Sequence, residues 1–432
     1  MQSKDILALG LGLESPWELV DQELNTEVEP HELHLRVSAP RGSLFPCPEC
    51  GQLCKARDFK EMTWRHLNFF QHHAYITADV PRTDCPDCGV KRITVPWARE
   101  GSHFTLLFEQ VALSLVREMP VSAAARQMGV TDKRLWRVVG HYVGRAMAQI
   151  DLSDVSAIAL DETAAKRGQH YVTVFIDLER SENPVIFATP GQDKNALRRF
   201  RNHLKAQDGS ANGVWEVVCD MSQAFQTGVT ETFPNASLTT DWFHVVQRVT
   251  DAMTATQFRR SKRARGRLQA HNDVRKAEAK ALKLPKGARW ATLKASERRR
   301  SRRQDQALDE LAAMGAATGQ AYAIKEKLRW VRQAATRQAA RWRLTRFLRL
   351  AKDLTAEVEA LAPMRRALAT IEHQFEAIIR RWRSTYSNAR LEGLNSIFQA
   401  ARARARGYRN QQTFITMIYL LAAPIGKVEK SI

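Results

Sequence analysis

Three short predicted strands, each followed directly by an aspartate, constrain the fold of this chain more than any other feature. They are residues 156–160, 214–219 and 236–240, which precede Asp161, Asp220 and Asp241. The first of them is apolar, and at about five residues it suits a strand better than a helix. A charge at the end of a buried strand is costly unless something pairs with it, and a divalent cation is a common partner. A single aspartate there is more often a cap or a turn residue, so the metal-site interpretation depends on the rest of the chain.

The segments around these strands alternate between strand and helix. A polar turn at residues 163–169 separates the first strand from a β-branched segment, which predicts a hairpin. We expect strands at residues 171–177 and 184–188, and helices at residues 195–205 and 222–231. Hairpin, third strand, helix, strand, helix, strand is the order of an RNase H-like fold. In such a sheet the first and fourth strands are neighbours, so Asp161 and Asp220 would face each other across a pair of metal ions.

Four of the six cysteines lie in two copies of one motif, Cys-Pro-x-Cys-Gly. Each copy has the form of a zinc knuckle, in which a tight turn directs two thiolates at one ion and the glycine lets the backbone reverse. Two knuckles supply the closed tetrahedral set of a structural zinc site. We therefore expect Zn²⁺ to be bound by Cys47, Cys50, Cys85 and Cys88. The alternative ligands are Cys54, His72 and His73.

The charge of the chain indicates a polyanionic partner. The net charge is +20 and the isoelectric point is near 10.0, which most simply fits nucleic acid. The length of 432 residues predicts about two to four domains. No apolar segment approaches the roughly 18 to 20 residues of a membrane span, and the N-terminus lacks the pattern of a signal peptide. We expect a cytoplasmic, nucleoid-associated protein with no membrane partner.

Residues 104–143 have the pattern of a helix-turn-helix. An apolar stripe predicts a helix over residues 104–118, Pro120 ends it, and Gly129 provides the turn before a second predicted helix, residues 133–143. The basic residues Lys133, Arg134 and Arg137 lie at the start of that helix, as in a recognition helix that enters the major groove. An ordinary helical hairpin is the alternative, and the charge of the whole chain favours DNA binding.

A basic, helix-rich segment follows the strands. Between residues 251 and 390 there are 34 Lys and Arg but only 13 Asp and Glu, so this segment carries about the whole net charge. Because no acidic surface balances that charge, phosphate binding is the favoured interpretation. Four Arg-Trp pairs occur at residues 289–290, 329–330, 341–342 and 381–382. Most of these tryptophans are expected in the core, and one could stack on an unpaired base.

A helix that begins near Ser387 or Asn388 carries a further carboxylate. Leu391, Leu394 and Phe398 are spaced to pack inward, with Ile397 beside them. Glu392 would then lie to one side of the apolar face, where it could meet the two aspartates. A basic run fits a phosphate backbone, and its members are Arg402, Arg404, Arg406 and Arg409.

Together these features resemble the DDE transposases of bacterial insertion sequences, specifically the ISL-three (ISL3) family. The matching segments follow the family's order and cover nearly the whole chain. They are the two cysteine motifs, the helix-turn-helix, and residues 159–162, 218–221, 241–244, 391–395 and 407–410. Each segment is weak evidence alone, and their combination is specific.

The resemblance implies a catalytic triad of Asp161, Asp220 and Glu392 that holds two Mg²⁺ ions, for which Mn²⁺ can substitute. It also implies that His244, in an Asp-x-x-His motif, assists near the active site. One ion would activate water or a 3′-hydroxyl, and the other would stabilise the leaving oxygen. Water would cleave at the end of the element, and the freed 3′-hydroxyl would attack target DNA. Trp242 stands where the family often has arginine, a departure that leaves the implied triad unchanged.

The expected fold class is an α+β multidomain protein with an RNase H-like catalytic domain interrupted by an all-α insertion. The expected domains are a zinc-binding region (1–100), the helix-turn-helix (101–150), the first part of the catalytic core (151–244), the basic insertion (245–384) and the C-terminal helices of the core (385–432). The two N-terminal domains would read terminal inverted repeats in double-stranded DNA, and joining two ends predicts a homodimer or larger assembly.

Two other functions fit parts of the sequence. One is a DNA-binding regulator, derived from a transposase, that binds repeats without cutting them. All three carboxylates are present, which favours catalysis. The other is an RNase H-like, structure-selective nuclease, which has no need of the zinc and helix-turn-helix domains as sequence readers. A sequence-specific footprint on one repeat would separate a nuclease from a transposase.

Overall fold

The structure is a computed structural model of two compact units. It describes residues 7–8, 11–166, 170–268, 285–293, 301–314, 317–384, 386 and 388–425, with the backbone alone at 258–268 and 289–290. The N-terminal unit consists of residues 1–150, 400–409 and 416–432, and the central unit consists of residues 151–399 and 410–415. The helix that carries Glu392 therefore contributes residues to both units.

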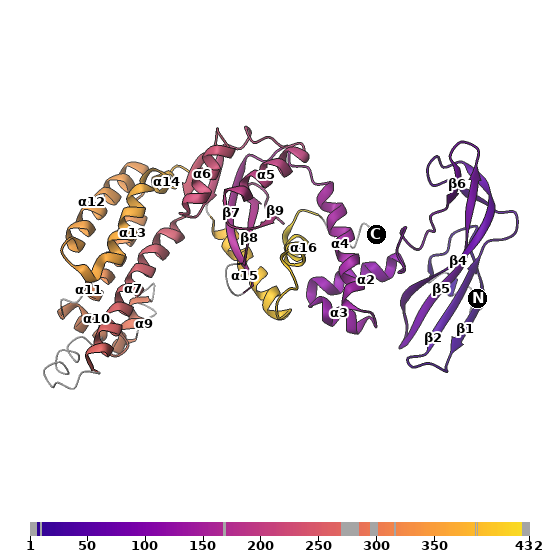
Figure 1. Cartoon of the computed structure of the whole chain (residues 1–432), viewed down its shortest axis with the longest axis horizontal. Coiled ribbons are helices and arrows are strands. Elements are labelled where there is room, and N and C mark those ends of the chain that lie inside the picture. The colour runs from indigo at the N-terminus through magenta and orange to yellow at the C-terminus, as the bar shows by residue number, and fades with distance from the viewer. Residues whose placement is uncertain are drawn as a thin grey trace. The chain divides into compact units, whose positions relative to one another are not determined.

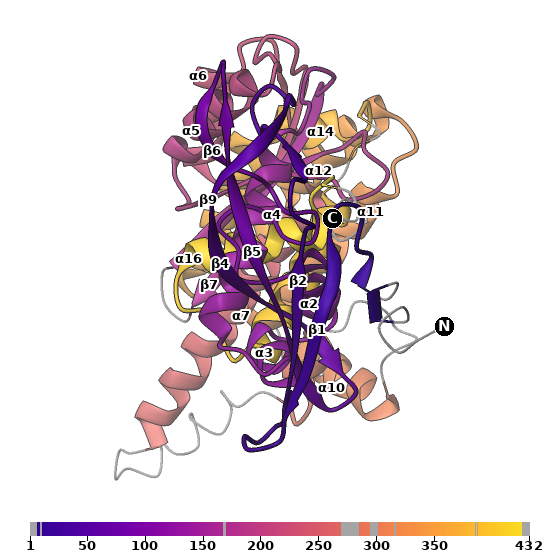
Figure 2. The same ribbon diagram turned by 90° about the vertical axis from the view of Figure 1, so that its right-hand side faces the viewer.

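A six-stranded sheet begins the N-terminal unit. Its strands are β1 (Glu18–Asn25), β2 (Glu32–Ser38), β3 (Leu44–Pro46), β4 (Leu53–Phe69), β5 (His72–Cys85) and β6 (Gly89–Arg92). The order is β1-β2-β5-β4-β3, with β6 paired to β5. Figure 2 shows the long β4–β5 hairpin. Alternate residues of β5 are buried, and three tryptophans, Trp17, Trp64 and Trp97, pack in the core of this sheet.

Three helices follow in the same unit: α2 (Leu106–Glu118), α3 (Val121–Gln127) and α4 (Asp132–Ala148). Thr105 caps α2, because its hydroxyl accepts a hydrogen bond from the backbone N–H of Phe108. α2 ends at Glu118, two residues before Pro120, as the sequence predicts, and Pro120 directly precedes α3. Glu109 is fully buried in α2, where it accepts hydrogen bonds from Tyr142 and Arg99 and so ties α4 to the segment that leads in from the sheet.

The central unit contains a five-stranded sheet with helices beside it (Figure 1). Its strands are β7 (Ala157–Lys166), β8 (His170–Asp177), β9 (Val185–Pro190), β10 (Glu216–Cys219) and β11 (Ser237–Thr240), and its helices are α5 (Lys194–Ala206) and α6 (Gln223–Thr232). The order is β11-β10-β7-β8-β9, with β7 antiparallel to β8 and parallel to β10. The predicted RNase H-like arrangement, with the first and fourth strands adjacent, is thus present.

The first strand is longer than the sequence predicts. The sequence predicts a polar turn from residue 163, but β7 continues to Lys166 because β8 pairs with it as far as His170. Thr163 and Ala165 are buried in this extension. Asp161 therefore lies within a paired strand instead of following its end.

An all-α insertion follows β11. Its helices are α7 (Trp242–Leu268), α9 (Ala288–Leu293), α10 (Arg302–Ala313), α11 (Ala317–Arg332), α12 (Arg337–Thr355), a 3-10 helix (Glu359–Leu361), α13 (Ala362–His373) and α14 (Phe375–Arg380). Its hydrophobic core includes Met221, which follows β10, together with Trp242 and Val245 at the start of α7. Gln374 adds polar contacts, since its amide oxygen accepts hydrogen bonds from Thr240 and Gln226. The insertion and the sheet are therefore joined by shared packing.

Candidate active site and metal centres

Asp161 is held by hydrogen bonds on both carboxylate oxygens. Its Oδ1 accepts from the backbone N–H of Glu162 at 2.8 Å, and its Oδ2 accepts from Asn395 Nδ2 at 3.0 Å. Asn395 comes from a helix far along the chain, so this second bond links the sheet to that helix. The carboxylate is thereby fixed in orientation.

Asp220 and Asp241 lie side by side at one edge of the sheet. Cys219 of β10 pairs in parallel with Thr240 of β11, and each strand is followed directly by its aspartate. The carboxyl ends of parallel strands are where such folds place ligands. Ser222 N–H donates to Asp220 Oδ1 at 2.9 Å, and Asp241 is only 6% exposed. Two carboxylates are therefore brought together by strand register alone.

Glu392 is carried by α15 (Ala389–Arg404), which the central unit holds at several points. Arg390 donates to the backbone carbonyls of Arg180 and Ser181, in the β8–β9 connection. Further along the helix, Gln399 Nε2 donates to Thr163 Oγ1 of β7 at 2.7 Å. Glu392, Asn395 and Gln399 are spaced by three and four residues, so they form one polar stripe along the helix.

The apolar face of α15 differs in part from the prediction. Leu391 and Phe398 are fully buried, as expected. Leu394 is half-buried. Ile397 is 50% exposed, so its expected place beside the inward residues is wrong. Ile397 lies two residues after Asn395, which places it away from the stripe that faces β7. The predicted start at Ser387 lies outside the described residues, and Asn388 directly precedes the helix.

Asp241, His244 and Glu392 form a cluster that could hold a metal ion. One ligand atom from each lies within 4.8 Å of the other two. Among the described residues, Glu392 Oε1 and His244 Nε2 are buried and have no hydrogen-bond partner. Buried polar atoms without a partner are costly, and a bound cation would satisfy both. The donor set therefore fits a divalent cation.

Crowding of carboxylates changes their acidity. Burial raises the pKa of Asp161, and the charges of Asp220 and Asp241 raise it further. Burial raises the pKa of Glu392 to about 7, and the neighbouring Asp241 adds to that effect. Burial likewise raises the pKa of Glu162 to about 7, with contributions from Asp220 and Asp161. Like charges this close favour protonation, and a divalent cation would reverse that preference.

The four residues predicted for catalysis lie in one region of the central unit. Asp161 is within electrostatic reach of Asp220, His244 and Glu392. The sequence predicts that Glu392 meets Asp161 and Asp220. In the structure a Glu392 carboxylate oxygen lies within 4.8 Å of ligand atoms of Asp241 and His244. Sequence reasoning did not assign a site role to Asp241, Glu162 or Asn395. Sequence signals exist for two of the three: Asp241 follows a strand like the other aspartates, and Asn395 lies one turn after Glu392.

The four predicted zinc ligands form a second cluster, in the N-terminal unit. One Sγ atom from each lies within 4.8 Å of the other three, and all four cysteines are free thiols. The two knuckles have matching turns, with Gly51 and Gly89 at φ of +77° and +74°, a conformation that favours glycine. Hydrogen bonds from the backbone of Cys88 lower the pKa of the Cys85 thiol to about 7. A tetrahedral set of thiolates fits Zn²⁺.

The alternative zinc ligands do not join this cluster. Cys54 is buried against it, and its thiol donates to the backbone carbonyl of Gln52 at 3.4 Å. The imidazole of His72 stacks on His31, with ring centres 5.2 Å apart. His73 lies against Gly129, at the turn of the helix-turn-helix.

The three basic residues at the start of α4 differ in their exposure to solvent. Lys133 and Arg137 are exposed and lie one turn apart on the same face. Arg134 is half-buried, and its guanidinium lies over the Phe104 ring at 4.2 Å. Lys133 and Arg137 are therefore the residues of this helix that are placed for contact with a phosphate or a base edge.

The C-terminal basic run, residues 402–409, begins in the last turn of α15 and continues beyond its end. Arg404 is exposed and donates to the backbone carbonyl of Glu118 at 3.0 Å, within the N-terminal unit. Arg406 and Arg409 are exposed, and Arg402 is half-buried. Tyr408 in this run packs edge-on against Trp136 of α4, at 6.2 Å between ring centres. The run is thus anchored to the helix-turn-helix.

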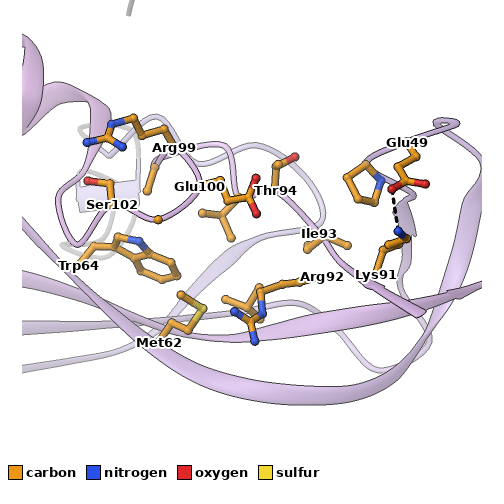
Figure 3. Close-up of a pocket in the computed structure, with 15 residues that line it drawn as sticks. Glu49, Met62, Trp64, Lys91, Arg92, Ile93, Thr94, Arg99, Glu100 and Ser102 are labelled. Carbon is orange, nitrogen blue, oxygen red and sulfur yellow. Dashed lines mark ion pairs between the residues drawn. The ribbon is translucent and has the colours of Figure 1, made fainter. Parts of the chain in front are cut away.

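A cavity of about 450 Å³ lies in the N-terminal unit (Figure 3). Its walls include Trp64 and Met62 from the sheet, Arg92, and the ion pair between Lys91 and Glu49 at 2.7 Å. All its lining residues fall between positions 48 and 102. None of the clustered carboxylates lines it, so the carboxylate cluster is a separate candidate site.

A sheet of this strand order, with carboxylates gathered at β7, β10, β11 and a late helix, defines the class of DDE enzymes with an RNase H-like core. Family models match three successive parts of the chain. Residues 43–88 match the zinc-finger of transposase IS204/IS1001/IS1096/IS1165, residues 93–143 match the helix-turn-helix domain of transposase family ISL3, and residues 158–418 match the transposase model of the ISL3 family. The chain belongs to the ISL3 family of DDE transposases.

Two curated relatives align along most of the chain. The transposase for insertion sequence element IS1557 of Mycobacterium tuberculosis is 27% identical over 408 residues, which cover 90% of this chain and 88% of that protein. The transposase for insertion sequence element IS1001 of Bordetella parapertussis is 24% identical over 388 residues, covering 88% and 89%. Within the described residues, no helix is long and apolar enough to cross a membrane.

Proposed function

We propose that this protein binds the terminal inverted repeats of its own insertion sequence and catalyses metal-dependent cleavage and strand transfer of DNA. The proposal is carried by the carboxylates that cluster with His244. Among the described residues, the buried Glu392 Oε1 and His244 Nε2 atoms have no hydrogen-bond partner. In this proposal Asp161, Asp220 and Glu392 are the catalytic triad, and His244 assists. The two Mg²⁺ ions, when bound, would activate the attacking oxygen and stabilise the leaving oxygen.

The chain's own residues would prepare the site. Asn395 holds Asp161 in one orientation, and the β10–β11 register sets Asp220 beside Asp241. Crowding favours protonated carboxylates in the absence of a cation, so cation binding would release protons. Water would be the first nucleophile, and the freed 3′-hydroxyl the second. No covalent bond between protein and DNA is needed.

The other domains would select the DNA. We assign reading of the repeats to the zinc region (1–100) and the helix-turn-helix (101–150), through the exposed Lys133 and Arg137, with Arg134 stacked on Phe104 at the start of the same helix. The C-terminal arginines Arg402, Arg404, Arg406 and Arg409 and the basic insertion (245–384) would bind phosphates. Joining two ends to one target needs two active sites, so a homodimer or larger assembly on DNA is expected. The place of action would be the nucleoid of a bacterial cell.

The test is cleavage of labelled duplexes that carry the element's own ends, with Mg²⁺. Wild type is compared with Asp161→Ala, Asp220→Ala and Glu392→Gln, each also measured for repeat binding. The expected result is a nick at the repeat boundary by wild type. In the variants we expect a loss of about a thousandfold or more in rate, with repeat binding retained.

Two outcomes would contradict the proposal. If wild type binds the repeats but never cuts them, even with Mn²⁺, the protein is a binding-only regulator. If it cuts branched or mismatched DNA equally well with and without the repeats, it is a structure-selective nuclease. Duplexes of scrambled sequence are the matched control for both.

A further inference from the structure

The Arg-Trp pairs of the insertion have different surroundings. Trp382 is half-buried, in agreement with the expectation of a core role. Trp330 and Trp342 are 37% and 59% exposed, so that expectation is wrong for them. The side chain of Trp290 lies outside the described residues. Exposed tryptophans on a basic surface call for an explanation, because burying an indole ring contributes strongly to stability.

Trp330 and Trp342 form one aromatic surface across two helices. Trp330 is near the end of α11 and Trp342 near the start of α12, and their rings meet edge to face at 5.5 Å. The Arg343 guanidinium lies 5.2 Å from the centre of the Trp330 ring and also donates to the Trp330 carbonyl at 2.7 Å. The pair is therefore held in place although it faces solvent.

Basic residues extend this surface along both helices. Arg346 and Arg349 follow Trp342 by four and seven residues, so they share its face of α12, and both are exposed. Lys327 precedes Trp330 by three residues on α11 and is exposed. Within the described residues, the ion pairs of α12 involve Arg337, Arg341 and Lys352. The arginines beside Trp342 are thus available to a phosphate.

A chain of contacts joins this surface to the active-site motif. The turn between α11 and α12 is fixed by Trp382, whose Nε1 donates to the Ala334 carbonyl at 2.8 Å. The Trp382 ring packs edge-on against Trp242 at 5.7 Å. Trp242 directly follows Asp241. The aromatic surface therefore lies at the end of the insertion that packs against the carboxylate-bearing strands.

We propose that Trp330, Trp342, Arg343, Arg346 and Arg349 form a platform that stacks an unpaired base of DNA and binds the phosphates beside it. An indole face accepts any base, an arginine over the ring adds a cation–π contact, and neighbouring cations follow the backbone. The ligand class is thus single-stranded or end-frayed DNA, in contrast to the duplex repeats assigned to the N-terminal domains. The inference rests on the proposed DNA function and adds a second, base-stacking site to it.

The test measures DNA binding without added Mg²⁺, so that cleavage does not enter. Full-length protein is titrated onto a duplex with a short single-stranded overhang that contains 2-aminopurine, and onto the same duplex with blunt ends. The variants are Trp342→Ala, Trp330→Ala and Trp342→Phe. Trp215→Ala is the matched control, because Trp215 is 47% exposed but directly precedes β10, outside the insertion.

Wild type is expected to quench 2-aminopurine and to bind the overhang more tightly than the blunt duplex. Trp342→Ala should weaken overhang binding by about tenfold, Trp330→Ala should weaken it by a similar or smaller factor, and Trp342→Phe should restore most of it. Blunt-duplex binding should be unchanged in every variant, and Trp215→Ala should behave as wild type.

Equal overhang binding by wild type and Trp342→Ala would overturn the platform while leaving the transposase proposal intact. Loss of self-association by light scattering, with overhang binding unchanged, would mean that the pair is a protein interface, and would also overturn it. If wild type binds neither duplex, the proposed DNA function itself fails.

Discussion

The two candidate metal-binding clusters of this chain are built in opposite ways. The cysteine cluster comes from two short motifs, each of which supplies two ligands and its own turn. The carboxylate cluster comes from three strands, the start of a long helix and a helix some 150 residues further on, so no two of Asp161, Asp220 and Glu392 share a local motif. A local site can form when its own turns form. A dispersed site exists only if the whole fold is correct. The following predictions test that contrast.

Loss of one zinc ligand should have the largest effect, confined to the N-terminal unit. Structural zinc contributes roughly 10–16 kcal/mol in small zinc domains. Cys85→Ser should therefore lose bound zinc and make the N-terminal sheet sensitive to protease, while the unfolding transition of the central unit persists. Zinc content and limited proteolysis measure this. Cys54→Ser, at a buried thiol next to the cluster, is the control and should keep its zinc. Full zinc content in Cys85→Ser would contradict the description of the four cysteines as one local zinc site.

Substitution in the dispersed site should change chemistry and leave folding intact. Asp241→Asn keeps the size of the side chain but removes a charge from the group with His244 and Glu392. We expect cleavage to fall by about ten- to a hundredfold, with an increased Mg²⁺ requirement. Because crowding of like charges is relieved, the metal-free variant should be at least as stable as wild type. A variant that unfolds, or that cleaves normally, would show that Asp241 is a structural residue only.

The acidity of the cluster predicts a pH dependence of stability. The pKa of Glu392 is raised from 4.5 to about 7, and that of Glu162 likewise, so the folded chain binds protons that the unfolded chain releases. The stability these groups contribute is present below about pH 4.5 and is lost as pH rises towards about 7. Mg²⁺ should therefore raise the melting temperature more at about pH 7.5 than at about pH 5. Glu392→Gln should reduce that difference, and an equal Mg²⁺ effect at both pH values would refute the prediction.

The same protons should limit cleavage. Below about pH 7, protonation of Glu392 competes with cation binding. The cleavage rate at limiting Mg²⁺ should therefore fall by up to about tenfold per pH unit. Saturating Mg²⁺ should shift the profile to lower pH. A rate that depends on pH equally at low and saturating Mg²⁺ would assign the titration to another group.

Removal of a second contact to Asp161 should have the smallest effect. Asn395→Ala deletes the hydrogen bond to Asp161 Oδ2, and we expect a few-fold loss in cleavage, because the backbone N–H of Glu162 still holds Oδ1. Asn395→Asp should lose more, since it places another negative charge in the cluster. Ser396→Ala on the exposed side of α15 is the control. If Asn395→Ala equals Asp161→Ala, the helix contact is as important as the ligand itself.

Local patterns in the sequence were sufficient to predict the zinc cluster and the sheet. Each knuckle carries its turn residues, and residues 156–160 and 214–219 are short, mostly apolar segments that are each followed by an aspartate. The length of β7 was not predictable, because Thr163 and the residues after it look like a turn until β8 is placed beside them. The pairing of β7 with β8, which is a non-local interaction, determines the length of β7.

The surroundings of the tryptophans also depended on packing. The Arg-Trp pairs look alike in sequence, but Trp382 lies in the turn after α14, where its backbone N–H donates to the carbonyl of the buried Ile379 at 3.2 Å and its ring packs against the core of the insertion. Trp342 lies two residues from both Ala340 and Leu344, on the opposite face. The spacing between each tryptophan and its apolar neighbours can be read from the sequence. Which apolar face the bundle uses was known only from the fold.

The core shared by the insertion and the sheet has a consequence for genetics and engineering. Met221, Trp242 and Val245 belong to the hydrophobic core of the helices, yet they adjoin Asp220, Asp241 and His244. The insertion is therefore not an accessory that a deletion could trim away while sparing catalysis. A mutation that loosens the bundle, such as Leu344→Ala, would be scored in a transposition screen as a catalytic defect, although the altered side chain belongs to no catalytic motif.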